Sequence, residues 1–131
     1  MILVDSSVWV DFFTTSPGPA GNELRRLIDD SEPFALTGVV VAEVLQGLTR
    51  DAVPIEGFLR QCDMLEPTGF QTYGKAAAIY RAARARGISL TTIDTLIAAI
   101  ALEHGARLFT LDQDFSRMAR MADLALYQLK Y

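Results

Sequence analysis

Short apolar runs alternate with longer segments of helical periodicity along the whole chain. This alternation is typical of a parallel sheet with helices on both faces. We predict strands at residues 2–5, 34–37, about 64–66, 107–110 and 124–128. We predict helices at residues 7–14, 20–30, 39–48, 55–62, 70–86, 92–104 and 115–121. The fold class is therefore α/β, a three-layer α/β/α sandwich whose central, mostly parallel sheet has about five strands.

Loops and helix ends divide these segments but mark no second domain. Residues 16–19, Ser-Pro-Gly-Pro, form the clearest loop, and Gly87 and Gly105 stand where helices should end. The 131 residues contain no repeat, low-complexity tract or linker. We therefore expect one domain over residues 1–131.

Composition indicates a globular protein. Half of the residues are hydrophobic, yet no run approaches the roughly 20 apolar residues of a membrane span. The first residues reach an acid at Asp5 without a basic segment, which favours a strand over a signal peptide. We expect a cytoplasmic protein with no membrane partner. The single cysteine, Cys62, cannot form an internal disulfide.

The net charge of −4 argues at first against a nucleic-acid partner, which usually meets a basic surface. The distribution of charge changes this interpretation. If five of the sixteen acids share one site, eleven remain against twelve Lys and Arg, and ten of those cations are arginines. Arginine forks suit phosphate, although each one could equally be a solvated side chain on a helix. The arginines that lie close together are Arg81, Arg84 and Arg86, with Arg117 and Arg120 near the end.

An acid ends the first strand, at the edge where open parallel sheets bind ligands. Asp5 follows three apolar residues in the strand that we expect to be most central. Its alternative role is to cap the next helix, but Ser6 or Ser7 could do that without a charge. We therefore favour a functional role for Asp5.

Two further acids lie on apolar helices, and each has a structural alternative. Glu43 is the only charge in residues 39–47 and shares a stripe with apolar positions, yet it could also face water. Asp94 completes a capping-box pattern that begins at Thr91, yet it also lies on the same side as Ile97. Both readings stay open for each acid.

Asp112 and Asp114 follow the fourth strand, which we expect beside the first. Five carboxylates from four segments would then converge, and such a cluster cannot stay ionised without a cation. Carboxylates without cysteine or a second histidine select the hard cations Mg²⁺ or Mn²⁺. One or two such ions bridged by a phosphodiester would support hydrolysis without a Ser or His nucleophile. We interpret the only histidine, His104, as structural because it ends a helix.

Four segments carry a family pattern, in order and in spacing: residues 2–10 (ILVDSSVWV), 42–47 (AEVLQG), 93–99 (IDTLIAA) and 110–115 (TLDQDF). The chain resembles PIN-domain ribonucleases and, more closely, the VapC-type toxins of toxin–antitoxin pairs. The resemblance fills the whole chain. It implies that Mg²⁺ or Mn²⁺ is held by the acidic quartet Asp5, Glu43, Asp94 and Asp112.

The resemblance also assigns supporting roles. Asp114 matches a variable position and would help with the metal or water, whereas Ser6 would form a hydrogen bond within the site. Proteins of this kind cleave RNA endonucleolytically, block translation and are silenced by an antitoxin similar to VapB, so RNA and such an antitoxin are the expected partners. The family further suggests a homodimer. We place the RNA backbone along Arg81, Arg84 and Arg86.

The first helix carries three aromatic residues, Trp9, Phe12 and Phe13. Together with apolar residues nearby, they could line a groove that receives a helix of the antitoxin. Their alternative place is the core. The apolar residues concerned are Val8, Leu45 and Leu48.

Other classes of protein fit less well. A signalling receiver domain needs a late lysine, and Lys130 is the penultimate residue. A haloacid-type phosphatase needs a second Asp where Ser7 stands. A non-catalytic PIN-like protein that only binds RNA or an antitoxin is the alternative from a different functional class.

Overall fold

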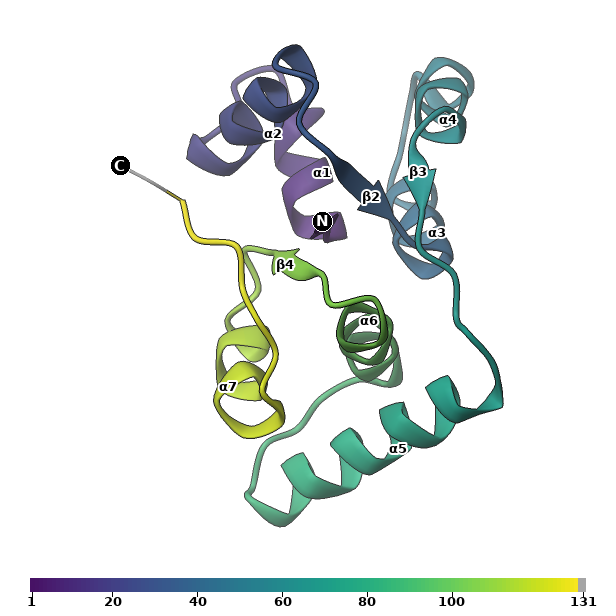
Figure 1. Ribbon diagram of the computed structural model, residues 1–131. Coiled ribbons are helices and arrows are strands. Elements are labelled where there is room, and N and C mark those ends of the chain that lie inside the picture. Colours follow the sequence, from purple (N-terminus) through teal and green to yellow (C-terminus); the bar gives the residue numbers. More distant parts are fainter. Residues whose placement is uncertain (130–131) are drawn as a thin grey trace.

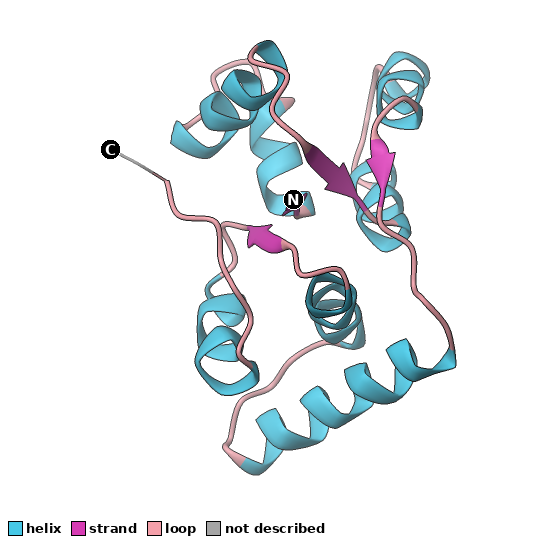
Figure 2. Cartoon of the chain, in the orientation of Figure 1, coloured by secondary structure: helices cyan, strands magenta, loops and turns pink. Residues whose placement is uncertain are grey.

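The computed structural model describes residues 1–129, so Lys130 lies outside the described residues. Strands and helices alternate along the chain (Figures 1 and 2). The strands are β1 (Ile2–Val4), β2 (Phe34–Leu36), β3 (Asp63–Met64) and β4 (Arg107–Phe109). The helices are α1 (Ser6–Phe12), α2 (Pro19–Asp29), α3 (Gly38–Gln46), α4 (Ala52–Arg60), α5 (Phe70–Ala85), α6 (Thr92–Glu103) and α7 (Gln113–Ala122). None of these helices is long and apolar enough to cross a membrane.

The four strands form one parallel sheet in the order β3-β2-β1-β4. Helices α1 and α2 lie on one side of it and α5, α6 and α7 on the other (Figure 1), which gives the predicted three-layer α/β/α sandwich. Strand β1 is central, and its Val4 pairs with Phe109 of β4. Because paired parallel strands end together, residues that follow Val4 and Phe109 emerge at the same edge.

The prediction of a fifth strand at residues 124–128 is wrong. This segment forms only an isolated bridge, between Leu126 and Leu108, with two backbone hydrogen bonds around Leu108. Its alternation of apolar residues is typical of a strand, but Asp123, in the left-handed conformation, ends α7 immediately before it. Only one residue pairs, so the sheet has four strands.

Most other predicted boundaries agree within about two residues. The larger difference is α4, which begins at Ala52 rather than residue 55, because Pro54 falls in the first turn, where a missing N–H costs nothing. Gly87 and Gly105 have φ angles of +75° and +61° and follow the ends of α5 and α6, as predicted.

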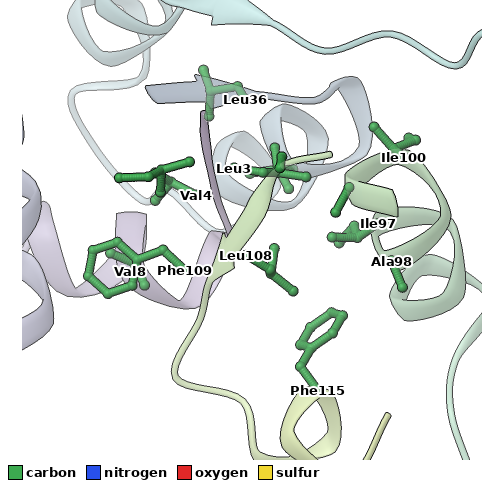
Figure 3. Packing of buried hydrophobic residues seen from close by; sticks show 14 of the residues in the cluster. Leu3, Val4, Val8, Leu36, Ile97, Ala98, Ile100, Leu108, Phe109 and Phe115 are labelled. Carbon is green, nitrogen blue, oxygen red and sulfur yellow. The ribbon is translucent and has the colours of Figure 1, made fainter. Parts of the chain in front are cut away.

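The core fills both faces of the sheet (Figure 3). Leu3, Val4 and Leu108 of the two central strands are fully buried. Figure 3 shows Val8 of α1 and Phe115 of α7 among the side chains that pack around these strands. Burial on both faces fixes the ends of β1 and β4, and with them the acids that follow.

Helices α1 and α2 are joined by an unusual cap. The N-cap of α2 is Gly18, which has no side chain. The carboxylate of Asp11 in α1 instead accepts hydrogen bonds from the backbone N–H of Gly18, at 3.1 Å, and of Gly21, at 2.7 Å. Asp11 is therefore an acid with a structural role, apart from the five candidate site residues.

Gly21→Ala should lower the free energy of unfolding by about 1–3 kcal/mol. A Cβ at this position would lie 2.9 Å from the backbone nitrogen of Phe12 and 2.9 Å from Pro17 Cβ, so α1 and α2 would have to separate. Gly74→Ala is the matched control, because a Cβ there meets nothing within 4 Å on α5. It should stabilise by about 0.5–1 kcal/mol. Chemical denaturation of both variants measures the difference, and equal effects would contradict the prediction.

Candidate metal centre

Four of the predicted acids line one pocket at the carboxyl edge of the sheet. Asp5 follows β1, Asp112 follows β4, Glu43 comes from α3 and Asp94 from the first turn of α6. The pocket has a volume of about 450 Å³. Its lining is Asp5, Ser6, Ser7, Val10, Glu43, Gln46, Asp94 and Asp112. The predicted fifth acid, Asp114, lies in the first turn of α7, two residues after Asp112, and groups with Asp94 and Asp112.

Asp5 is buried, with 4% of its surface exposed, and it occupies the N-cap position of α1, but its side chain accepts no capping hydrogen bond from that helix. Its Oδ2 accepts hydrogen bonds from Ser7 Oγ and from Thr110 Oγ1, both at 2.8 Å. These hydroxyls also bind the loop after β4, since Leu111 N donates to Ser7 Oγ and Asp112 N donates to Thr110 Oγ1. Asp5 is thus fixed from two strands at once.

Sequence reasoning missed Ser7 and Thr110 as parts of this site. The sequence suggests a helix cap at Ser7 and a strand end at Thr110, and both residues fall in the family segments, but neither is predicted to bind an acid of the site. The available signal was their position, because each lies just after a central strand and the two strands pair. Hydroxyls at adjoining strand ends can reach a shared carboxylate.

Glu43 is partly buried and receives a hydrogen bond from Ser6 Oγ to Oε1, at 3.1 Å. Burial raises the pKa of Glu43, and the nearby charges of Asp5, Asp94 and Asp112 raise it further, while the Ser6 bond acts in the opposite direction. The structure therefore turns Glu43 toward the acids rather than only toward water, and it places Ser6 beside Glu43.

Asp94 caps its helix and also lies among the other acids. It completes a capping box with Thr91: Asp94 N donates to Thr91 Oγ1 at 3.1 Å, and Thr91 N donates to Asp94 Oδ2 at 3.4 Å. It also lines the acidic pocket. Burial raises the pKa of Asp94, with contributions from Asp112 and Asp114 that the bonds to Thr91 oppose.

Asp112 and Asp114 begin α7. Asp112 is the N-cap, and its Oδ1 accepts a hydrogen bond from Asp114 N at 2.9 Å. Asp114 Oδ1 forms an ion pair with Arg117 at 3.4 Å. One carboxylate oxygen from each of Asp94, Asp112 and Asp114 lies within 4.8 Å of the others, close enough to share one ion.

The five carboxylates share one pattern of hydrogen bonding. Each of the five acids uses one oxygen for bonds within the protein and keeps the other without a hydrogen-bond partner in residues 1–129. Of these five acids, only Asp114 has a Lys, Arg or His side chain of residues 1–129 within ion-pair distance. A hard divalent cation fits this donor set, because it takes carboxylate oxygens and neutralises their repulsion.

The aromatic residues of α1 are mostly interior. Trp9 is fully buried and contacts Phe12 and Phe13, which are half-buried, as well as Phe34 and Phe58. The core alternative therefore holds for Trp9. His104 lies at the other end of α6, where its Nε2 is 2.8 Å from the carbonyl oxygen of Glu66, in agreement with a structural role.

Comparison with known proteins shows the family of this chain. The family model described as PIN domain matches residues 2–121. The chain belongs to the PIN-domain family. This PIN domain is 36% identical over 128 residues to "VapC ribonuclease Mb1587" of Mycobacterium bovis and to "Ribonuclease VapC11" of Mycobacterium tuberculosis. Each alignment covers 95% of this chain and 96% of the relative, so the predicted resemblance to VapC-type toxins is confirmed.

Solved structures share the fold of this PIN domain. A DNA-bound VapBC from Salmonella typhimurium matches with a TM-score of 0.77 and 15% identity, over 98% of each chain. FitAcB from Neisseria gonorrhoeae matches with a TM-score of 0.73 and 22% identity, over 98% of this chain and 97% of that chain. At these identities the likeness concerns the fold.

Glu43→Gln should stabilise the protein at about pH 7 in the presence of a chelator. The raised pKa of Glu43 means that the folded state binds the proton more tightly, so its charge costs stability above that pKa. The benefit of the neutral amide should therefore begin to fall as the pH drops below the raised pKa, and it should be gone once the pH is below the ordinary pKa of a glutamate. Thermal unfolding across this pH range measures it.

Glu66→Gln is the matched control, because Glu66 is exposed and lies outside the pocket. It should leave the melting temperature unchanged at both ends of the pH range. A lower melting temperature for Glu43→Gln at neutral pH would show that this carboxylate stabilises the fold, contrary to the prediction.

Proposed function

We propose that this protein is the toxin of a toxin–antitoxin module, an endoribonuclease that depends on Mg²⁺ or Mn²⁺ and inhibits translation by cleaving RNA. The observation that carries the proposal is the meeting of five carboxylates, from four segments, at one edge of the sheet. The names of the relatives, which are VapC ribonucleases, support the same reaction.

The proposed metal ligands are Asp5, Glu43, Asp94 and Asp112, with Asp114 as a helper to metal or water. Their oxygens without protein partners are the ones available to the ion. When bound, a divalent cation lowers the pKa of a water molecule and neutralises charge on a phosphodiester.

The remaining polar residues of the pocket position these carboxylates. Ser7 and Thr110 hold Asp5 through Oδ2, and Ser6 holds Glu43 through Oε1. Thr91 holds Asp94 in the first turn of α6. Because each bond fixes one oxygen, the other oxygen has little freedom to turn away. This is the preorganisation that a site for ion and phosphate requires.

The proposed protein partner is an antitoxin similar to VapB. Solved structures of the same fold are titled as VapBC from Rickettsia felis, bound to a DNA fragment from its promoter, and as a VapBC from Salmonella typhimurium. In this chain the apolar side chain of Val10 is 55% exposed and lines the acidic pocket. An antitoxin segment that covers the pocket could bury it. We also propose a homodimer in the cytoplasm, as the family suggests.

Purified protein should cut RNA into discrete fragments in Mg²⁺ or Mn²⁺, and EDTA should stop the reaction. Asp5→Asn should reduce cleavage about a hundredfold or more, because it removes a charge from the proposed ligand set. Asp63→Asn is the control, since Asp63 is exposed at the start of β3 and outside the pocket. Gel analysis of total RNA measures the rates.

The metal should also raise the melting temperature of the wild-type protein, because it binds only the folded site. Asp5→Asn should lose most of this increase, whereas Asp63→Asn should keep it. If the metal binds and no RNA is cut, the result supports the alternative, a non-catalytic PIN-like protein that only binds RNA or an antitoxin. If the metal neither binds nor promotes cleavage, the proposal fails.

A further inference from the structure

A second pocket lies on the other side of the first turn of α6. It has a volume of about 330 Å³ and runs between α5 and α6. Its lining is Tyr73, Ala76, Ala77, Tyr80, Arg81, Thr92, Thr95 and Leu96. Thr92 and Thr95 flank Asp94 in the sequence, and Asp94 lines the acidic pocket. Both pockets are therefore lined by residues of the first turn of α6, a helix about 10–12 Å wide.

Aromatic rings and a cation meet in this second pocket. Tyr73 is 53% exposed, and Tyr80 is half-buried. The guanidinium of Arg84 lies 3.4 Å from the hydroxyl oxygen of Tyr80, and Arg81 is part of the lining. Flat apolar surfaces beside cationic forks are what an unpaired nucleobase and its phosphate require.

The charge around this pocket is opposite to that of the rest of the chain. Residues 70–87 contain Lys75 and three arginines, Arg81, Arg84 and Arg86, but no acid, in a protein whose net charge is −4. This excess of positive charge complements a polyanion. It lies beside the pocket where a phosphodiester would be cut, so one strand could contact both.

We propose that the pocket between α5 and α6 binds an unpaired base of the RNA, one or two nucleotides from the phosphate at the acidic site. Tyr73 and Tyr80 supply the stacking surface, and Arg81 and Arg84 contact the adjacent phosphates. The pocket then selects single-stranded RNA over a duplex, because only an unpaired base can enter it. This inference rests on the proposed ribonuclease function and names the binding site for its substrate.

A binding assay tests the inference separately from cleavage. The probe is a short single-stranded RNA of mixed sequence that contains the fluorescent base 2-aminopurine, whose emission falls when it stacks. Binding is measured with Asp5→Asn protein in Mg²⁺, which should leave the RNA intact. The fluorescence should fall on binding, and the same RNA annealed to its complement should bind more weakly.

Tyr80→Ala and Tyr73→Ala should each weaken binding about tenfold, the size expected for the loss of one stacked base. Each of these two substitutions should also reduce the fluorescence change on binding. All of these variants are made in the Asp5→Asn protein. Tyr80→Phe keeps the aromatic ring and should bind the RNA nearly as well as the Asp5→Asn protein without a second substitution. Circular dichroism of each variant separates a lost contact from a lost fold.

Arg81→Gln should weaken binding and reduce its dependence on salt by about one phosphate contact. Arg60→Gln is the matched control, an exposed arginine on α4. It should change neither quantity.

Several outcomes would overturn the inference while leaving the proposed function intact. One is cleavage by the wild type together with unchanged RNA affinity in both tyrosine variants. Another is a protein that is a dimer as wild type and a monomer in the tyrosine variants, with unchanged RNA affinity per chain. That result would mean that a second copy of the chain covers the pocket. A third is the absence of any binding of the single-stranded probe at low salt, together with cleavage of total RNA by the wild type. Conversely, stacking in the pocket without cleavage by the wild type would support the inference and contradict the proposed reaction.

Discussion

Repulsion among carboxylates is the constraint on which the functional edge of this molecule depends. Five acids meet beyond the ends of β1 and β4, beside α3 and the first turns of α6 and α7. Burial raises the pKa of Glu43 and Asp94, which makes the charges of these two carboxylates costly. The fold tolerates this because Arg117 pairs with Asp114, and hydroxyls and backbone N–H groups bind one oxygen of each of the other four acids. These bonds stabilise the charges without cancelling them, so the site remains a strong attractor for a cation. The proposed affinity for an ion would therefore come from the same hydrogen bonds that hold these side chains in place.

The sheet determines which acids can meet. Strand β1 lies between β2 and β4, so Asp5 emerges at the centre with the loop after β4 beside it. Two hydroxyls, those of Ser7 and Thr110, connect the ends of these strands. The helices supply the remaining acids from their first turns or from their faces. A first turn is a favourable place for an acid, because its N–H groups and the helix dipole partly offset the negative charge.

Much of this could be predicted from the sequence, and the exceptions have physical reasons. The apolar runs and glycine positions predicted the layers, and the acids at strand ends predicted which residues converge. The pattern could not distinguish a strand from a half-buried extended segment, because residues 124–128 alternate in the same way as a strand. The pattern also left a helix cap and a metal ligand as alternative roles for Asp94. The two are compatible, because a carboxylate has two oxygens, and Asp94 both completes the capping box and lines the acidic pocket. The supporting hydroxyls depend on pairing between distant strands, which local patterns do not contain.

The cap that Asp11 provides for α2 also bears on the order in which the chain folds. Because Gly18 lacks a side chain, the first turn of α2 gains its carboxylate cap only once α1 is present. The contact spans few residues, so its loop-closure entropy is small and the two helices can form together early. Strand β1 and Asp5 directly precede α1. The first acid of the site is therefore next to a local folding unit, whereas Asp94 and Asp112 must arrive through closures of about a hundred residues.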